Sequence, residues 1–331
     1  MSTRFPDVDT VASALALATR APSVHNVQPW QWRVGDESLH LYADPGRRLV
    51  HTDPDGRDTI VSCGVALNHC VIALAALGWQ SKIRRLPNPA DPSHLAPVEL
   101  HPHAADEVDV MLAAAIPRRR TDRRYFSGWP VALGDISLMG ARAARAGVTM
   151  RRVEPSTALR AALARAVWEH ATDQQYLEEL TAWSGRHASS VGVPARNTPE
   201  SNPDSPVPSR MFAGASLAQP VEASAADDHG ALLALGTVAD DDLSRLRAGE
   251  ATSLVLLTAT ALGLASCPIT EPLEVAETRD AIRMDAFGDE QFPQMHLKVG
   301  WAPVNADPLP STPRRPLDEV VTRLDGSRFV Y

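Results

Sequence analysis

Five arginines stand within seven residues of an otherwise acidic chain, in the segment Pro117-Arg-Arg-Arg-Thr-Asp-Arg-Arg-Tyr-Phe126. A guanidinium group presents a planar fork of donors that matches two phosphate oxygens, and the hydroxyl of Thr121 adds another donor. The segment therefore predicts a clamp for an anion. A solvated basic turn is the alternative that the same composition allows.

A second polar segment, Ala-Pro-Ser-Val-His-Asn-Val-Gln-Pro-Trp at residues 21–30, follows an apolar helical pattern at 11–20. Pro22 ends that helix, because a proline disfavours α geometry in the residue before it. The Ser23 hydroxyl, the Asn26 and Gln28 amides and several backbone N–H groups are then free to bind a ligand. An ordinary connection to the strand expected at 31–34 is the alternative.

Length and composition set the class of protein. The chain has 331 residues, a hydrophobic content of 44% and a net charge of −8, which argues against general affinity for nucleic acid. No apolar run approaches the roughly 18–20 residues that span a bilayer, and residues 1–10 carry no signal pattern. Three cysteines match no metal spacing and indicate reduced thiols. We expect a cytoplasmic protein without a metal site or a membrane partner.

The elements that position these segments follow from periodicity. Helices are expected at 59–78, 111–116, 135–147, 156–184 and 242–263, and strands at 31–34, 39–42, 98–100, 232–238 and 295–300. Residues 264–271 are predicted to form a tight connection. The stretch 185–220 holds six prolines and no period, which is typical of a functional lid or of disorder.

Two of the expected helices resemble each other. Residues 64–78 align with residues 249–263, with glycine at both ends of each segment and Ala66 matching Ala251. Alanine-rich faces let helices approach closely, so the pair is predicted to pack at the centre of the fold. Chance similarity between two buried helices is the alternative. A real repeat implies two similar halves, residues 1–108 and residues 109–331, with the stretch 185–220 inserted in the second.

Four segments together resemble the FMN-dependent nitroreductase family. Residues 21–30 resemble its A-P-S-x-x-N-x-Q-P-W signature, and Arg-Arg-Thr-Asp-Arg at 119–123 resembles its R-x-S-x-R element, with Thr121 in place of the usual serine. Leu-Gly-Leu-Ala-Ser-Cys-Pro-Ile-Thr at 262–270 is similar to its glycine-led segment, and Arg-Arg-Pro-Leu at 314–317 to its basic C-terminal contact. The whole length looks most like the Acg-type, dormancy-associated mycobacterial group of nitroreductase-like proteins.

The resemblance implies an α+β, nitroreductase-like fold in which two tandem halves form a pseudo-dimer with one FMN site per chain. Such a chain would be a monomer or a weak homodimer. The implied function is NAD(P)H-dependent reduction of nitroaromatic or quinone-like compounds. The alternative is a non-catalytic protein that stores or sequesters FMN under a closed lid.

The resemblance also implies the site residues. The flavin carries the hydride chemistry, so no protein nucleophile is needed. Arginines would hold the phosphate, Arg123 would lie near N1 and the C2 carbonyl, and Ser23 and Asn26 would touch the edge of the ring. The residues expected to bind FMN are Pro22, Ser23, Val24, His25, Asn26, Gln28, Arg119, Arg120, Thr121, Arg123, Cys267, Pro268, Ile269, Thr270, Arg314 and Arg315. Thr270-Glu271 stands where many relatives carry Glu-Gly.

Overall fold

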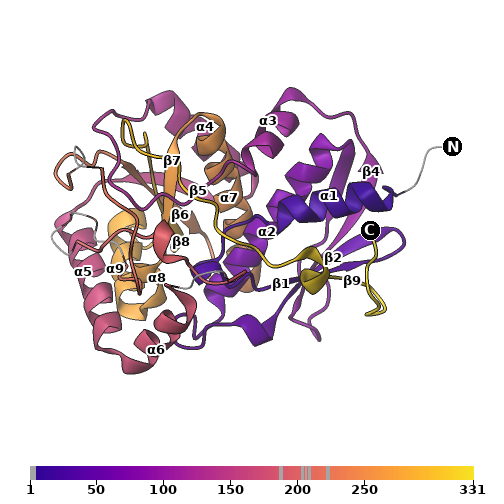
Figure 1. The fold of residues 1–331 in the computed structure, drawn as a ribbon, viewed down its shortest axis with the longest axis horizontal. Coiled ribbons are helices and arrows are strands. Elements are labelled where there is room, and N and C mark those ends of the chain that lie inside the picture. The colour runs from indigo at the N-terminus through magenta and orange to yellow at the C-terminus, as the bar shows by residue number, and fades with distance from the viewer. Residues whose placement is uncertain (1–4, 186–188, 203–204, 206, 208–209, 221–223) are drawn as a thin grey trace.

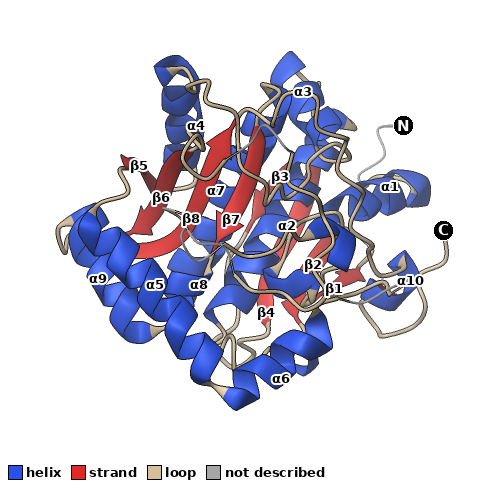
Figure 2. Cartoon of the chain, turned by 60° about the vertical axis from the view of Figure 1, so that its left-hand side comes forward, coloured by secondary structure: helices blue, strands red, loops and turns tan. Residues whose placement is uncertain are grey.

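The computed structural model describes residues 5–185, 189–202, 205, 207, 210–220 and 224–331. Two separate sheets flank a central pair of long helices, α2 (Arg57–Ala76) and α7 (Asp242–Ala261), which Figure 1 shows in the middle of the molecule. Of the remaining helices, some pack against this central pair and others against the second sheet, and Figure 2 shows them from another side. The architecture is α+β, as predicted.

The first sheet is built from the N-terminal part of the chain and one C-terminal strand. Its strands are β1 (Trp30–Val34), β2 (Ser38–Ala43), β3 (Trp79–Ile83), β4 (His94–Pro102) and β9 (Val321–Arg323), in the order β3-β4-β2-β1-β9. Neighbouring strands are antiparallel except β1 and β9, which run parallel with Trp32 opposite Val321. The C-terminal tail therefore returns to the sheet where the chain began.

The second sheet lies entirely in the later part of the chain and is antiparallel. Its strands are β5 (Thr149–Val153), β6 (Ala231–Thr237), β7 (Ala265–Ile269) and β8 (Phe292–Gly300), in the order β5-β6-β8-β7. Strand β7 occupies the segment that the sequence predicts to be a tight connection, and that prediction is wrong. The strand is short and contains Pro268, which an edge strand tolerates because one side of it needs no ladder hydrogen bonds.

The expected helices are present, but one of them is broken in two, and the helix at Ala276–Phe287 and two short helices were not predicted from the sequence. The helices are α1 (Val8–Ala18), α2 (Arg57–Ala76), α3 (Glu107–Ala115), α4 (Leu133–Arg145), α5 (Thr157–Thr172), α6 (Gln174–Trp183), α7 (Asp242–Ala261), α8 (Glu271–Glu274), α9 (Ala276–Phe287) and α10 (Leu317–Val320). The single helix expected over 156–184 is wrong, because Asp173 ends α5 and caps α6. Its carboxylate accepts hydrogen bonds from the backbone N–H groups of Gln175 and Tyr176.

Helices α2 and α7 pack directly against each other, which confirms the prediction for the matched pair. A Cβ atom added to Gly64 would lie 2.1 Å from the carbonyl oxygen of Leu246, and one added to Gly249 would lie 2.1 Å from that of Val61. The absence of a side chain at both glycines therefore sets the distance between the helices.

Helix α2 corrects one expectation from the sequence. It has 20 residues, and in the part of the chain that the structure describes it alone is long and apolar enough to cross a bilayer. Asn68 and His69 interrupt its apolar run in the sequence, but they do not lower its overall hydropathy enough to exclude it. In the fold, 78% of its most apolar window is buried, as a core helix requires.

Candidate functional site

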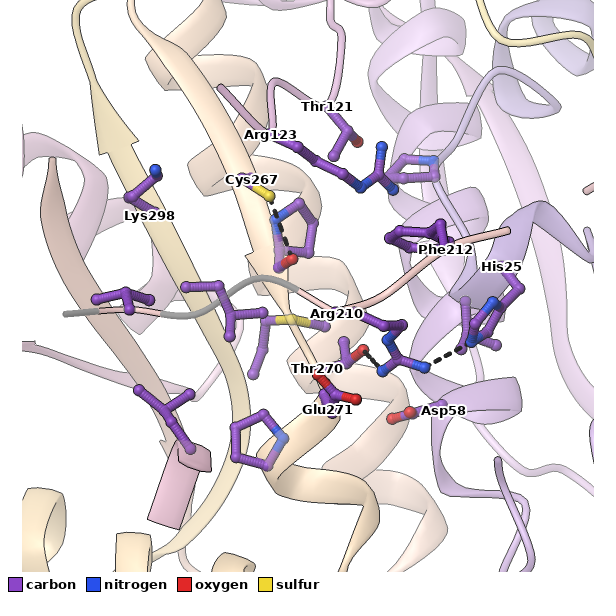
Figure 3. A pocket seen from close by; sticks show the side chains of 18 of the residues that line it. His25, Asp58, Thr121, Arg123, Arg210, Phe212, Cys267, Thr270, Glu271 and Lys298 are labelled. Atoms are coloured by element: carbon purple, nitrogen blue, oxygen red, sulfur yellow. Dashed lines mark hydrogen bonds between the residues drawn. The ribbon is translucent and has the colours of Figure 1, made fainter. Parts of the chain in front are cut away.

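A cavity opens between the second sheet and the loop that precedes β1, beside the N-terminal part of α2. It is lined by the loop that precedes β1, by α2, by the arginine-rich segment, by β7 and β8, and by part of the stretch 185–220. We call it the central cavity (Figure 3). The predicted cofactor contacts that line it are Pro22, Ser23, Val24, His25, Thr121, Arg123, Cys267, Pro268, Ile269 and Thr270.

The loop that borders the cavity is strained. His25, Asn26 and Gln28 adopt φ angles of 43°, 55° and 55°, a region that residues other than glycine rarely occupy. The Ser23 hydroxyl accepts a hydrogen bond from the backbone N–H of Gln28 at 2.9 Å and so holds the turn in place. Strain of this kind persists where the surroundings over-determine the backbone, and it is concentrated at binding sites.

Asn26 and Gln28 turn away from the cavity, in contrast to the expectation that Asn26 touches the edge of a ring. The Asn26 amide donates hydrogen bonds to the carbonyl oxygens of Gly192 (3.0 Å) and Pro313 (3.1 Å). The Gln28 amide donates to the carbonyl of Ser190 at 2.9 Å and accepts from the backbone N–H of Arg315 at 2.8 Å. Both side chains are buried, so their role here is to fasten two distant segments to the loop.

The arginine-rich segment lies beside the edge strand β7. Thr121 forms a β-bridge with Ser266, and the backbone N–H of Asp122 donates to the Ser266 carbonyl at 2.9 Å. Arg124 forms a buried ion pair with Asp122 at 2.9 Å and is therefore structural. Arg123 reaches the central cavity, where its guanidinium carbon lies 4.9 Å from the centre of the Phe212 ring.

A second, smaller cavity is lined almost entirely by cations. We call it the arginine cavity, and its lining residues are Arg20, Ile116, Arg119, Arg120, Thr312 and Arg314. The Nε atoms of Arg20, Arg119 and Arg120 are buried without a hydrogen-bond partner among the described residues. Burial, reinforced by the neighbouring guanidinium groups, lowers the pKa of Arg119 to about 10 and that of Arg314 to about 9.

This arrangement favours binding of an anion. In the described part of the chain no carboxylate forms an ion pair with any of the four arginines, and a buried cation such as Arg119 is costly without a counter-charge. The two cavities are adjacent, since Arg119 donates to the hydroxyl of Thr121 at 3.4 Å and Thr121 lines the central cavity. An elongated ligand with an anionic end could occupy both cavities, with its anionic end among the arginines.

Two of the basic residues differ from expectation. Arg315 lies outside the arginine cavity, and its Nε pairs with Glu319 at 3.3 Å. Arg20 lines the arginine cavity, although it was not among the residues expected to bind FMN. Its position directly before the 21–30 segment is the signal that would have identified it. Arg314 also donates to the carbonyl oxygens of Thr19, Arg20 and Ala21, which directly follow α1.

The stretch 185–220 contributes Glu200, Asn202, Ser205, Val207, Arg210, Phe212 and Gln219 to the lining of the central cavity. Arg210 is its main attachment. Its side chain is 9% exposed, forms an ion pair with Glu274 and donates to the Tyr176 hydroxyl at 2.9 Å and to the Thr270 hydroxyl at 3.1 Å. It also donates to Nε2 of His25 at 2.6 Å (Figure 3). Burial first and the charge of Arg210 second hold the pKa of His25 well below its usual value, so that the ring is neutral and accepts.

Acidic side chains border the same cavity. Asp58 and Glu271 line it, and Glu271 is paired with Nδ1 of His170 at 3.1 Å. Asp58 accepts a hydrogen bond from Arg57 at 3.0 Å through Oδ1, while Oδ2 is buried without a partner in the described structure. Neither acid was selected from the sequence. Asp58 sits in a turn-to-helix segment whose composition indicates only an ordinary helix start.

Comparison with known proteins gives consistent matches. The profile of the nitroreductase family matches residues 116–301. The protein named "Putative NAD(P)H nitroreductase Rv3131" of Mycobacterium tuberculosis (strain ATCC 25618 / H37Rv) is 61% identical over 321 residues, which cover 97% of this chain and 93% of that protein. "Putative NAD(P)H nitroreductase acg" of the same strain is 35% identical over 323 residues, which cover 94% and 95%. Among solved structures, the FMN-dependent nitroreductase NfnB from Mycobacterium smegmatis in complex with NADPH aligns at 18% identity and a TM-score of 0.38, over 64% of this chain and 99% of that one.

Proposed function

The chain belongs to the nitroreductase family, as its motifs predicted, and from this premise we propose that it is an NAD(P)H-dependent FMN oxidoreductase that reduces nitroaromatic or quinone-like compounds. The observation that carries the proposal is that the arginine cavity lies beside a larger cavity, which is lined by both polar and apolar residues. Four cations without a carboxylate partner among the described residues suit a dianionic phosphate. The central cavity suits a ring system with both polar and apolar edges.

The residues present fit FMN in distinct roles. Arg20, Arg119, Arg120 and Arg314 would hold the phosphate, and Thr121 would contact the ribityl chain. Arg123 would place a positive charge near N1 and the C2 carbonyl of the ring, and residues 267–270 of β7 and its end would border the ring. When bound, FMN supplies hydride transfer between the nicotinamide and the acceptor. The chain itself binds, orients and shields the reactants.

We further propose that residues 1–108 and 109–331 are two fused nitroreductase-like halves. Support comes from the two sheets, from the matched helices that cross at Gly64 and Gly249, and from a cavity with walls from both parts. Because both walls come from one chain, the protein is proposed to be active as a monomer or in a weak homodimer.

A second function is favoured by the position of Arg210 and Phe212. Both side chains come from the stretch 185–220 and line the central cavity, where they occupy room that a nicotinamide or an acceptor would need. Under this alternative the stretch is a lid closed over FMN, and the protein stores or sequesters the flavin.

The test begins with the visible spectrum of freshly purified protein, because a colourless protein that refuses added FMN would contradict both functions. Anaerobic addition of NADPH, with dithionite as the positive control, then separates them. Bleaching by NADPH supports the oxidoreductase, and bleaching by dithionite alone supports storage. In the second case, deletion of residues 192–212 should restore access for NADPH. If it does not, the stretch is not a lid.

A further inference from the structure

The loop that precedes β1 holds two segments that arrive from far along the chain. The side-chain nitrogen of Asn26 donates to the carbonyl oxygens of Gly192 and Pro313, at 3.0 and 3.1 Å. The Gln28 amide bonds to nearby residues of the same two segments. One segment belongs to the stretch 185–220 and the other leads to α10 and β9. Two buried amides of one loop therefore fasten both segments at the same place.

The second segment, residues 310–316, is a strap without helix or strand structure. Pro310, Pro313 and Pro316 have no backbone N–H group, so the strap cannot join a regular hydrogen-bond ladder, and side chains are needed to satisfy its carbonyl oxygens. We call it the C-terminal strap, and Figure 1 draws it in yellow where it approaches α10. It carries Arg314 into the arginine cavity. There the guanidinium group donates to the three carbonyl oxygens that directly follow α1.

A third amide joins the strap to the stretch 185–220 directly. The side chain of Asn197 donates to the carbonyl oxygen of Pro310 at 2.9 Å. The backbone carbonyl of Asn197 accepts a hydrogen bond from Arg123, which lines the central cavity, at 3.2 Å. In the described structure none of the three amides lines either cavity. They lie behind the residues that are proposed to contact FMN.

Burial of these amides ties the two segments to each other. Gln28 is 0%, Asn197 3% and Asn26 5% exposed. If the strap moved without the stretch 185–220, or the stretch without the strap, a buried N–H group would lose its acceptor. An unsatisfied buried donor is costly, so we expect the two segments to keep or leave their positions together.

We propose that Asn26, Gln28 and Asn197 are positioning residues, which hold Arg314 in place for the phosphate of FMN and link that phosphate to the placement of residues 189–198. The inference rests on the proposed binding of FMN in the two cavities. It means that the chain distinguishes FMN from riboflavin partly through amides that touch neither. Because coupling between two sites is reciprocal, the bound phosphate must in turn stabilise the position of residues 189–198.

Titration of the apoprotein with FMN and with riboflavin, which lacks the phosphate, tests the first half of this coupling. Effects confined to the central cavity cancel in the ratio of the two affinities. Asn197→Ala and Asn26→Gly should each lower the preference for FMN at least about fivefold, as is typical of coupled sites. Glycine is used at position 26 because it tolerates the φ of 55°. The control is Tyr176→Phe, which removes a hydrogen bond of Arg210 elsewhere in the stretch and should leave the preference unchanged.

Hydrogen exchange of the wild-type protein tests the second half, and it needs no variant to fold. Backbone N–H groups of residues 189–198, which line neither cavity, should exchange more slowly at saturation with FMN than at saturation with riboflavin. In Asn197→Ala the two flavins should protect these residues equally. Equal protection in the wild type, or an unchanged preference for FMN in folded Asn197→Ala and Asn26→Gly, would overturn the coupling and leave the FMN site standing. A wild-type protein that binds neither flavin would overturn the proposed function, and the coupling with it.

Discussion

Gly64 of α2 and Gly249 of α7 face each other at the centre of the fold, so closely that a Cβ on Gly249 would lie 2.7 Å from the Cα of Gly64. Gly64→Ala should therefore force the helices apart, since its methyl group would also lie 2.1 Å from the carbonyl oxygen of Leu246. We expect a loss of at least about 3 kcal/mol in the free energy of unfolding, at the upper end of overpacking effects. Urea denaturation monitored by circular dichroism measures it.

The matched control is Gly134→Ala in α4, where an added Cβ meets nothing within 4 Å. Alanine is favoured over glycine in a helix by about 0.5–1 kcal/mol, so this variant should be as stable as wild type or more so. Equal effects of the two substitutions would mean that the helix crossing does not depend on the glycines.

Arg119→Ala should move cofactor affinity and apoprotein stability in opposite directions. Loss of a charge-assisted hydrogen bond of about 1.5–3 kcal/mol should weaken FMN binding roughly 10- to 100-fold. The apoprotein should be as stable or more stable, because a buried cation that neighbouring guanidinium groups repel is removed. Fluorescence titration with FMN and thermal denaturation of the apoprotein measure the two effects.

Two neighbouring arginines serve as controls for that experiment. Arg118 is exposed and Arg315 is paired with Glu319, so Ala substitutions of either should leave FMN affinity within about threefold of wild type. If Arg315→Ala releases FMN while Arg119→Ala retains it, the phosphate binds elsewhere and the assignment of the arginine cavity is wrong.

Much of the site could be predicted because its signals are local. The 21–30 loop, the 119–123 segment and residues 267–270 each carry a motif within a few residues, and the structure brings all three to one cavity. The division into halves, in contrast, stays a prediction. The break at Asp173 had a readable signal, since aspartate is a preferred N-cap residue.

The residues that were missed depend on distant contacts. Arg210 lies in a stretch without periodicity, and its partner Glu274 is far along the chain, so no spacing rule links them. Burial is the main cause that raises the pKa of Asp58, and the sequence near residue 58 does not reveal that burial. The side-chain direction of Asn26 was likewise set by Gly192 and Pro313, which only the folded chain brings close.

The ion pair between Arg210 and Glu274 predicts a strong coupling between the stretch 185–220 and α8. Arg210→Met would leave a buried carboxylate without its partner, which typically costs about 3–5 kcal/mol. Adding Glu274→Gln should recover part of that loss, and urea denaturation of both single variants and the double variant gives the coupling energy. Arg165→Met breaks a pair on the surface of α5 instead and should cost less than about 1 kcal/mol. Additive effects of the two substitutions at 210 and 274 would show that the pair does not hold the stretch in place.

His69 predicts a loss of stability in mild acid. It is buried between α2 and α7, where Nδ1 lies 2.9 Å from the Ser253 hydroxyl, and burial first and Arg119 second lower its pKa to about 3. An unfolded histidine has a pKa of about 6.5, so the contribution of His69 is complete above that pH. Below it the unfolded state binds a proton that the folded state refuses, and stability falls by about 1.4 kcal/mol per pH unit for this group.

Urea denaturation at a series of pH values measures that slope, to which the buried rings of His25 and His296 also contribute, because burial lowers the pKa of both. His69→Gln should make the decline between about pH 6 and pH 4 shallower by close to one proton. His101→Gln, at an exposed position of β4, is the control and should leave the slope unchanged. If the slope of His69→Gln equals that of wild type, the ring must already be protonated in the folded state, or exposed to solvent, in contrast to its position between the two central helices.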